Sequence, residues 1–258
     1  MNEKINNIIN KKNNSKIISL TAYSKNIAQI IDKYVDITLV GDSVASVLYN
    51  YNTTRKITLK TMIEHAKSVR MGVNKSLMVF DMPYNTYKNK KIALVNAKSV
   101  IKKTKSDAIK LEGGFKIKQV VKHLIKNKIP VLGHLGIMPQ SVRGKFKSKG
   151  KTDLERKKIL NDAKLLEKLG VFAIVLECIE KSLAKKITNE IKIPTIGIGS
   201  SVNCDGQILV TDDLIGLTNS KIRFVKKYIN ISKNIGHAVK KFKQEVKSKK
   251  YPTKKYSY

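Results

Sequence analysis

Five short apolar runs in this chain each stop at an ionisable residue. The runs ITLVGD, LMVFD, AIKLE, PVLGH and FAIVLE end at Asp42, Asp81, Glu112, His134 and Glu177. A charge inside a buried strand is costly unless it is paired, so we expect each one just beyond its strand. Because all five follow their runs, the polar groups are predicted at one end of a single parallel sheet. In a (β/α)8 barrel that end forms the active site.

Strand and helix patterns alternate along the chain. Apolar runs typical of strands occupy residues 16–22, 36–41, 76–80, 107–112, 129–133, 171–176, 193–199 and 207–211. Helical spacing occupies residues 25–33, 59–71, 91–103, 115–126, 154–169 and 181–190. This alternation indicates an α/β fold with a parallel sheet. Eight strands in 258 residues fit a closed (β/α)8 TIM barrel better than an open sheet, which the pattern alone leaves possible.

The chain carries no linker-like stretch, so we expect a single domain over residues 1–258. Residues 1–15 form a polar N-terminal extension. Beyond the eighth predicted strand, residues 232–247 carry apolar side chains at helical spacing, which predicts an extra C-terminal helix. With its tail to residue 258, this helix is a candidate for packing on, or being swapped with, a neighbouring subunit.

Charge and composition narrow the class of protein. The chain has 52 Lys and Arg residues against 19 Asp and Glu, a net charge of +33, yet only five of the basic residues are Arg. Nucleic-acid readers favour Arg clustered on one face, so we favour compositional drift and expect no specific nucleic-acid partner. A basic nucleic-acid-binding protein remains the alternative of another class.

The two cysteines show no zinc or disulfide pattern, and no apolar span or signal peptide is present, which favours a cytoplasmic protein without a membrane partner.

Three of the strand-end carboxylates suit a hard cation. Mg²⁺ takes one or two protein carboxylates, keeps waters and accepts further oxygens from its substrate. Each acid alone could instead cap a helix that follows its strand. Asp42, Asp81 and Glu112 together make that reading improbable, so they are the candidate metal ligands.

Other residues extend the candidate site. Lys110 lies two residues before Glu112, so both point to the same side of their strand, where a lysine needs an anionic partner. His134 is either a structural histidine or a site residue. Glu177 ends its strand among apolar neighbours and is the candidate general base. The glycines of residues 193–206 indicate a close approach of the backbone to a phosphate or another part of a substrate.

The motifs of residues 16–252 resemble those of the ketopantoate hydroxymethyltransferase family. The matching segments are ISLTAY (18–23), LVGDS (39–43), DMP (81–83), KLEGG (110–114), GHLGIMPQSV (133–142), VLECI (175–179), IPTIGIG (193–199), DGQILV (205–210) and the terminal YP. The resemblance implies a pantothenate-synthesis enzyme that adds a hydroxymethyl group from methylenetetrahydrofolate to α-ketoisovalerate (3-methyl-2-oxobutanoate). It also implies a (β/α)8 barrel in a homodecamer of two pentamers, with the C-terminal helix exchanged between subunits.

The resemblance also implies roles for individual residues. Asp42 and Asp81 would hold Mg²⁺ directly, with Glu112 in support. The keto acid would be bound by Asp42, Ser43, Asp81 and Lys110, and His134 would bond the new hydroxyl group. Glu177 would accept the proton that is removed when the enolate forms.

Three segments depart from the family pattern. Ser24 and Asp212 replace the usual aspartate and histidine, and residues 143–152 are short and lysine-rich. The metal set is unaffected, but folate contacts and loop closure are less certain to carry over. An alternative within the same barrel type is another Mg²⁺-dependent α-keto acid enzyme, of the phosphoenolpyruvate mutase or isocitrate lyase kind. Those enzymes usually carry a catalytic cysteine in a loop, a place that neither Cys178 nor Cys204 fits.

Overall fold

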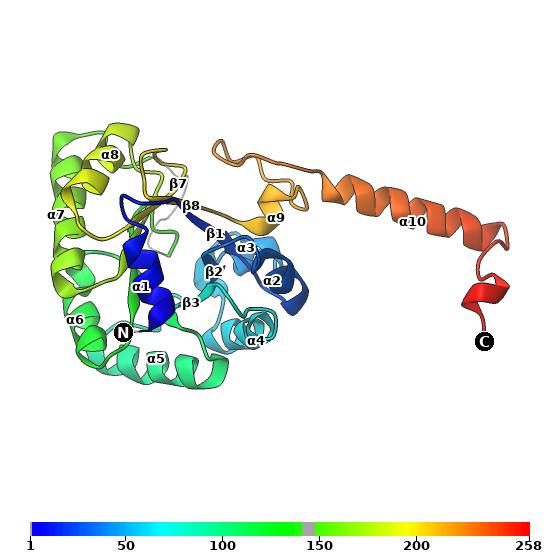
Figure 1. Ribbon diagram of the computed structural model, residues 1–258, viewed down its shortest axis with the longest axis horizontal. Helices are drawn as coiled ribbons and strands as arrows, with labels where there is room; N and C mark the ends of the chain where they lie inside the picture. Colours follow the sequence, from blue (N-terminus) through cyan, green and yellow to red (C-terminus); the bar gives the residue numbers. More distant parts are fainter. Residues whose placement is uncertain (1, 141–147) are drawn as a thin grey trace. The chain divides into compact units, whose positions relative to one another are not determined.

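Within residues 2–140 and 148–258, which the computed structural model describes, eight parallel strands close into a barrel. The strands are β1 (Ile17–Thr21), β2 (Ile37–Val40), β3 (Leu77–Asp81), β4 (Ala108–Glu112), β5 (Val131–Gly136), β6 (Ala173–Glu177), β7 (Thr195–Ile198) and β8 (Gly206–Leu209). Each strand pairs with the next, and β8 pairs with β1 (Figure 1). The predicted (β/α)8 fold is confirmed.

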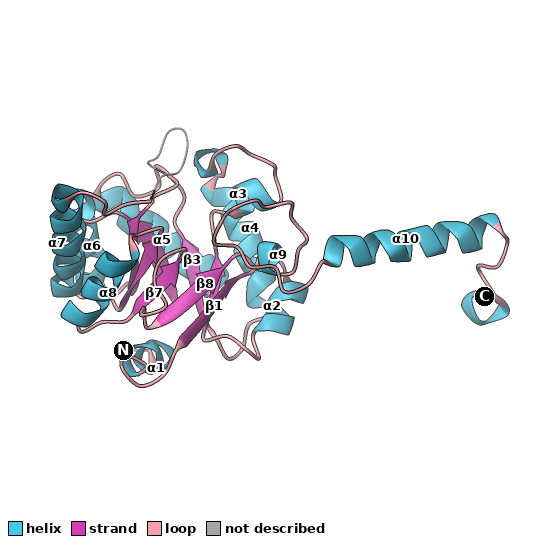
Figure 2. Cartoon of the chain, turned by 90° about the horizontal axis from the view of Figure 1, so that it is seen from above, coloured by secondary structure: helices cyan, strands magenta, loops and turns pink. Residues whose placement is uncertain are grey.

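Helices follow the strands and cover the outside of the barrel. They are α2 (Lys25–Ile31), α3 (Val44–Val47), α4 (Leu59–Arg70), α5 (Lys90–Thr104), α6 (Lys118–Lys126), α7 (Asp153–Leu169) and α8 (Lys181–Glu190). Figure 2 shows the strands enclosed between α6, α7 and α8 on one side and α2, α3 and α4 on the other. Several helices begin where the sequence offers a capping side chain: Thr58, Asn89 and Thr152 each accept a bond from a backbone N–H three residues on.

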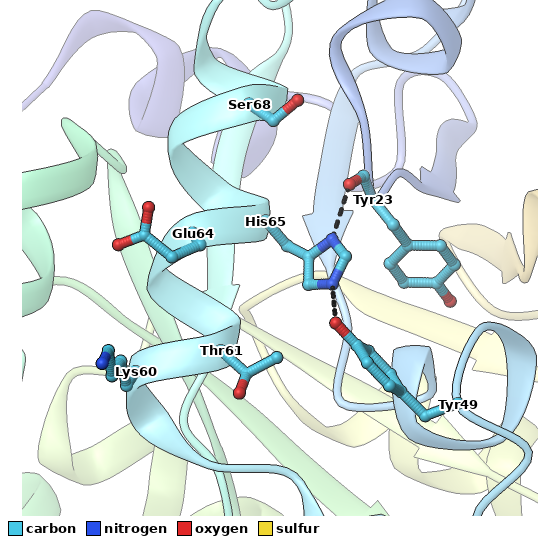
Figure 3. A pocket seen from close by; sticks show the side chains of 7 residues that line it. All are labelled: Tyr23, Tyr49, Lys60, Thr61, Glu64, His65 and Ser68. Carbon is cyan, nitrogen blue, oxygen red and sulfur yellow. Dashed lines mark hydrogen bonds between the residues drawn. The ribbon is translucent and has the colours of Figure 1, made fainter.

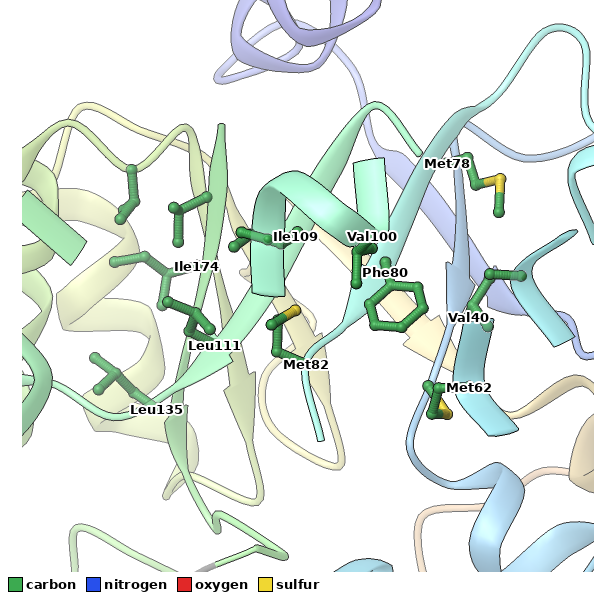
Figure 4. Packing of buried hydrophobic residues seen from close by; sticks show 14 of the residues in the cluster. Val40, Met62, Met78, Phe80, Met82, Val100, Ile109, Leu111, Leu135 and Ile174 are labelled. Atoms are coloured by element: carbon green, nitrogen blue, oxygen red, sulfur yellow. The ribbon is translucent and has the colours of Figure 1, made fainter. Parts of the chain in front are cut away.

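An apolar layer fills the space between strands and helices. Phe80 of β3 is fully buried there with Met62 of α4 and Val100 of α5 (Figure 4). Burying a side chain of this size contributes about 1.5–3 kcal/mol. This layer holds the outer faces of the strands in place and leaves the inner faces to form the site.

A second apolar cluster fills the barrel interior and includes helix α1 (Glu3–Asn10). Ile5 and Ile8 of that helix are buried with Ile17, Ile37 and Leu77 at the start of their strands. The polar extension expected from the sequence therefore contains an amphipathic helix that closes the N-terminal end of the barrel. The C-terminal end is the one left for polar side chains.

The chain divides into two compact units, Met1–Val210 and Thr211–Tyr258. The first contains the barrel, and the second contains the short helix α9 (Thr211–Leu214) and the long helix α10 (Ile231–Lys247). Helix α10 confirms the extra C-terminal helix expected over residues 232–247. In the described part of the chain, no helix has the length and apolar character needed to cross a membrane.

Candidate active site

Strands β3 to β5 bring the predicted polar side chains together inside the barrel. In the register of the sheet, Asp81 lies opposite Lys110, and Glu112 lies opposite His134. Side chains two residues apart share a face, and Val79 of β3 belongs to the interior cluster, so Asp81 also points inward. All four polar side chains are at most 5% exposed. The shared face of Lys110 and Glu112, predicted from their spacing, is confirmed.

Most of the ionisable residues lie within their strands, so the expectation that each follows its strand is wrong. Asp81, Glu112 and Glu177 are the last residues of β3, β4 and β6, and His134 lies inside β5. Asp42 alone follows its strand as expected. The buried charges are tolerated because opposite charges lie next to them, which offsets the loss of hydration.

Asp81 is the centre of the acidic side of the site. Its Oδ2 accepts hydrogen bonds from Lys110 Nζ at 2.7 Å and from the backbone N of Asp42 at 3.2 Å. Burial raises the pKa of Asp81 to about 7; the carboxylates of Asp42 and Glu112 add to the rise and the Lys110 ammonium opposes it. Burial alone would lower the pKa of Lys110, but the carboxylates of Asp81, Asp42 and Glu112 outweigh it and raise that pKa. Lys110 therefore stays charged.

His134 lies between two carboxylates. Its Nδ1 is 3.5 Å from Glu112 Oε1 and its Nε2 is 3.2 Å from Glu177 Oε2, although neither contact is aligned as a hydrogen bond. Burial and Lys110 lower the pKa of His134, but the two carboxylates raise it to about 9, so the ring is an imidazolium at neutral pH. Burial raises the pKa of Glu112, with His134 opposing the rise. The Glu177 side chain is 20% exposed, so a ligand can reach it.

Gln140 belongs to the site and was missed in the sequence. Its side chain donates to Asp42 Oδ2 at 3.0 Å, and its backbone N donates to Glu112 Oε2 at 3.1 Å. The residue is 2% exposed. An uncharged residue of a loop gives no periodic or charge signal, and only its place in the PQS motif could have marked it.

Ser43 lies beside Asp42 at the start of α3. Its Oγ is 2.8 Å from the hydroxyl of Tyr23, which follows β1. This hydroxyl pair joins the ends of β1 and β2 next to Asp42. The proposed contact of Ser43 with a substrate stays a prediction.

The residues present fit a divalent cation that is completed by a substrate. Asp81 Oδ1 and Glu112 Oε1 are buried and have no hydrogen-bond partner, which leaves carboxylate oxygens free to coordinate. Among the described residues, no three His, Cys, Asp or Glu side chains are grouped so that they could hold a metal ion by themselves. Mg²⁺ is commonly held by one or two carboxylates together with waters and substrate oxygens, so the donor set suits it.

Two of the glycines expected to approach a substrate, Gly197 and Gly206, are also required by the packing of the barrel. A Cβ on Gly206, the first residue of β8, would lie 2.4 Å from the backbone oxygen of Ile17 in β1. A Cβ on Gly197 would lie about 3.0 Å from the Gln207 side chain. Both glycines allow close contact between neighbouring strands of the barrel.

A surface groove of about 670 Å³ is lined by residues other than the predicted site residues. Figure 3 shows its lining, in which His65 of α4 points toward Tyr23 and Tyr49 and Glu64 extends from the other side of the helix. His65 Nδ1 is 2.8 Å from the backbone oxygen of Tyr23, so Nδ1 carries the proton and Nε2 accepts from the Tyr49 hydroxyl at 2.9 Å. The histidine thus links α4 to two loops and has no free donor or acceptor for chemistry.

Comparison with known proteins gives matches over the whole chain. A family model described as "Ketopantoate hydroxymethyltransferase" matches residues 2–254. The chain is 67% identical over 258 residues to the 3-methyl-2-oxobutanoate hydroxymethyltransferase of Pelagibacter ubique (strain HTCC1062), covering 100% of both chains. It is 45% identical over 257 residues to the protein of that name from Helicobacter pylori (strain ATCC 700392 / 26695), covering 98% of this chain and 95% of the relative.

Solved structures with the same fold are much more distant in sequence. A phosphonopyruvate hydrolase complex with oxalate and Mg²⁺ gives a TM-score of 0.63 at 10% identity, covering 98% of this chain and 93% of that one. A 2,3-dimethylmalate lyase, a member of the PEP mutase/isocitrate lyase superfamily, gives a TM-score of 0.63 at 10% identity, covering 100% and 89%. At these identities the likeness shows the fold alone.

Proposed function

The chain belongs to the ketopantoate hydroxymethyltransferase family and transfers a hydroxymethyl group to 3-methyl-2-oxobutanoate, and we propose that the polar cluster at the barrel mouth carries out this reaction with Mg²⁺. The observation that carries the proposal is the convergence of Asp81, Lys110, Glu112 and His134 on one buried face beside Asp42. Such a cluster is costly to bury and is expected at a site where charge develops during a reaction.

Asp42 and Asp81 would hold the metal, with Glu112 in support. The partnerless Oδ1 of Asp81 and Oε1 of Glu112 support this assignment. When bound, Mg²⁺ withdraws electron density from the keto group of the substrate and so eases loss of a proton from the neighbouring branched carbon.

The keto acid would be held by Asp42, Ser43, Asp81, Lys110 and His134. Lys110 keeps a full positive charge among the carboxylates, and in a site with little water this charge attracts the substrate carboxylate strongly. The His134 imidazolium lies next to Glu177 and is suited to donate a hydrogen bond to the new hydroxyl group. The substrate would thereby be oriented with its branched carbon toward Glu177.

Glu177 would act as the proton acceptor. It is the most exposed of the site carboxylates that end a strand, and the positively charged His134 ring lies beside it, with Nε2 3.2 Å from Glu177 Oε2. The C–H bond of the branched carbon breaks, the proton goes to Glu177, and the electron pair forms the enolate. Removing this proton by a positioned base typically contributes about 10²–10⁴-fold to the rate.

Methylenetetrahydrofolate would be the one-carbon donor. The two bonds from the methylene carbon to folate nitrogens break, the enolate carbon forms a bond to that carbon, and water supplies the oxygen and proton of the new hydroxyl group. The two folate nitrogens take up the proton held by Glu177 and the second proton of the water. Tetrahydrofolate and ketopantoate leave, and no oxidant or reductant is needed. The net positive charge of +33 favours approach of both anionic substrates.

We also propose that the protein works as a homo-oligomer, a decamer of two pentamers in which residues 232–258 pack on a neighbouring copy. Helix α10 supports this, because one stripe of it exposes Ile235, Val239, Phe242 and Val246 by between 46% and 58%. An apolar stripe of this kind is stabilised when a partner covers it.

The proposed function is tested by assaying two variants with Mg²⁺, keto acid and methylenetetrahydrofolate. Asp81→Asn should lose metal-dependent binding of the keto acid. Glu177→Gln should bind the keto acid but fail to exchange the proton of its branched carbon with deuterium from solvent. Wild-type protein that makes no ketopantoate but cleaves a carbon–carbon bond of a related acid would contradict the proposal and favour a lyase of the same fold.

A further inference from the structure

Gln140 is an uncharged side chain with a fixed orientation among the site carboxylates. Its Oε1 accepts from the Tyr87 hydroxyl at 2.7 Å, and its Nε2 donates to Asp42 Oδ2 and to the backbone oxygen of Met82, each at 3.0 Å. Turning the amide over would aim its oxygen at two acceptors, so the network allows only one orientation. The donor end of Gln140 therefore faces Asp42.

The contacts of Gln140 leave two carboxylates with one oxygen each. The side chain occupies Oδ2 of Asp42, and the backbone N–H occupies Oε2 of Glu112 at 3.1 Å. The other oxygen of Glu112 is buried without a hydrogen-bond partner. An oxygen that already accepts a hydrogen bond coordinates a cation less readily, so each of these carboxylates favours coordination through its other oxygen.

We propose that Gln140 is a positioning residue that makes the site prefer Mg²⁺ to Ca²⁺. The inference rests on the metal site of the proposed function. Mg²⁺ demands a small octahedral shell and accepts single carboxylate oxygens, whereas Ca²⁺ takes six to eight oxygens and gains from carboxylates that bind through both. The hydrogen bond from Gln140 to Oδ2 of Asp42 disfavours the two-oxygen coordination from which Ca²⁺ gains. Without the Gln140 amide, Asp42 is free to bind through both oxygens and the preference shifts toward Ca²⁺.

The direct test is Gln140→Met, which keeps the length and volume of the side chain but removes its donor and acceptor. Binding of Mn²⁺ to purified protein is followed by electron paramagnetic resonance, and Mg²⁺ and Ca²⁺ are each titrated to displace it, so the readout needs no turnover. We expect the ratio of the Mg²⁺ to the Ca²⁺ association constant to fall at least about tenfold, as for other residues that orient metal ligands. An unchanged ratio in folded protein would overturn the proposal.

Tyr87→Phe is the matched second variant. It removes only the hydroxyl that anchors Gln140 Oε1, and the ring of Tyr87 stays packed against the apolar layer. We expect the Mg²⁺ preference to fall in the same direction by about threefold, since the amide remains but is less well oriented. If circular dichroism shows that Gln140→Met does not fold, Tyr87→Phe becomes the test. A lower ratio of the Mg²⁺ to the Ca²⁺ association constant supports the proposal, and an unchanged ratio rejects it.

The measurement separates this inference from the proposed function. Wild-type protein that binds the metals with the expected variant effects, but makes no ketopantoate, supports the role of Gln140 and contradicts only the reaction. An active wild-type protein whose Gln140→Met variant keeps the Mg²⁺ preference contradicts only the role of Gln140.

Discussion

Lys110 and Asp81 form an ion pair inside the barrel, with 2.7 Å between Nζ and Oδ2 and at most 5% of either side chain exposed. The pair joins β4 to β3 at the level where the apolar interior gives way to the polar mouth. Neither charge can be removed without leaving the other in a place that water reaches poorly. The pair is therefore part of both the fold and the site.

Replacing Lys110 with Met should destabilise the protein by about 1–3 kcal/mol at pH 8, because Asp81 loses its partner and must either keep an unpaired buried charge or take up a proton. The loss should be smaller at pH 5, where a carboxyl with its pKa already raised to about 7 is neutral. Urea unfolding at the two pH values measures the difference. Adding Asp81→Asn to the Lys110→Met variant should recover part of the loss at pH 8, and equal losses at both pH values would contradict the account.

His134 gives the stability of the protein a separate pH dependence. Its pKa is raised from the ordinary value of 6.5 to about 9 in the folded state, so folding favours the protonated ring. The stabilisation is fully present below about pH 6.5 and is lost as the pH rises through about 9. Unfolding free energies of wild type and His134→Gln, measured from pH 6 to pH 10 with chelator present, should differ most at low pH. A difference that grows with pH would contradict this assignment.

The alternation of apolar runs and helical spacing was enough to predict the barrel, because a parallel strand buried on both faces leaves a nearly continuous apolar run. The role of α1 was not apparent. Ile5 and Ile8 are three residues apart in a polar segment, and their burial depends on the open end of a barrel that forms from distant strands. The many polar residues around Ile5 and Ile8 hide the apolar face of the helix, and the residues that bury this face are distant in the sequence.

The candidate site was predictable where the strand period decides direction, as for Lys110 and Glu112. The ends of the strands were harder to predict. Pairing with β6 extends β5 past His134 to Gly136, and the sequence gives no sign of this pairing. Gln140 was out of reach for a different reason. Its partners come from β4 and from the segments after β2 and β3, and none of these contacts follows a sequence period.

Lys12 should fix helix α1 to the barrel. Its Nζ donates to Asp205 Oδ2 at 2.9 Å with at most 8% of either side chain exposed, and Asp205 also accepts from Thr195 N. We expect Lys12→Met to lower the free energy of unfolding by about 3 kcal/mol, since it leaves a buried carboxylate unpaired. Lys11→Met is the control: its pair with Asp36 is more exposed, and its loss should cost at most about 1 kcal/mol. Similar losses in the two variants would show that burial does not distinguish these pairs.

Phe242 should be required for assembly and dispensable for folding of the barrel. The side chain is 54% exposed on the apolar stripe of α10, which lies in the second unit of the chain, so replacing it removes nothing from the barrel core. We expect Phe242→Glu to lower the mass measured by sedimentation equilibrium, because a charge on the stripe must lose its hydration when a second copy covers it. Lys240→Glu places the same acid beside the stripe and should leave the mass unchanged. An assembled Phe242→Glu protein would show that this stripe is not the contact between copies.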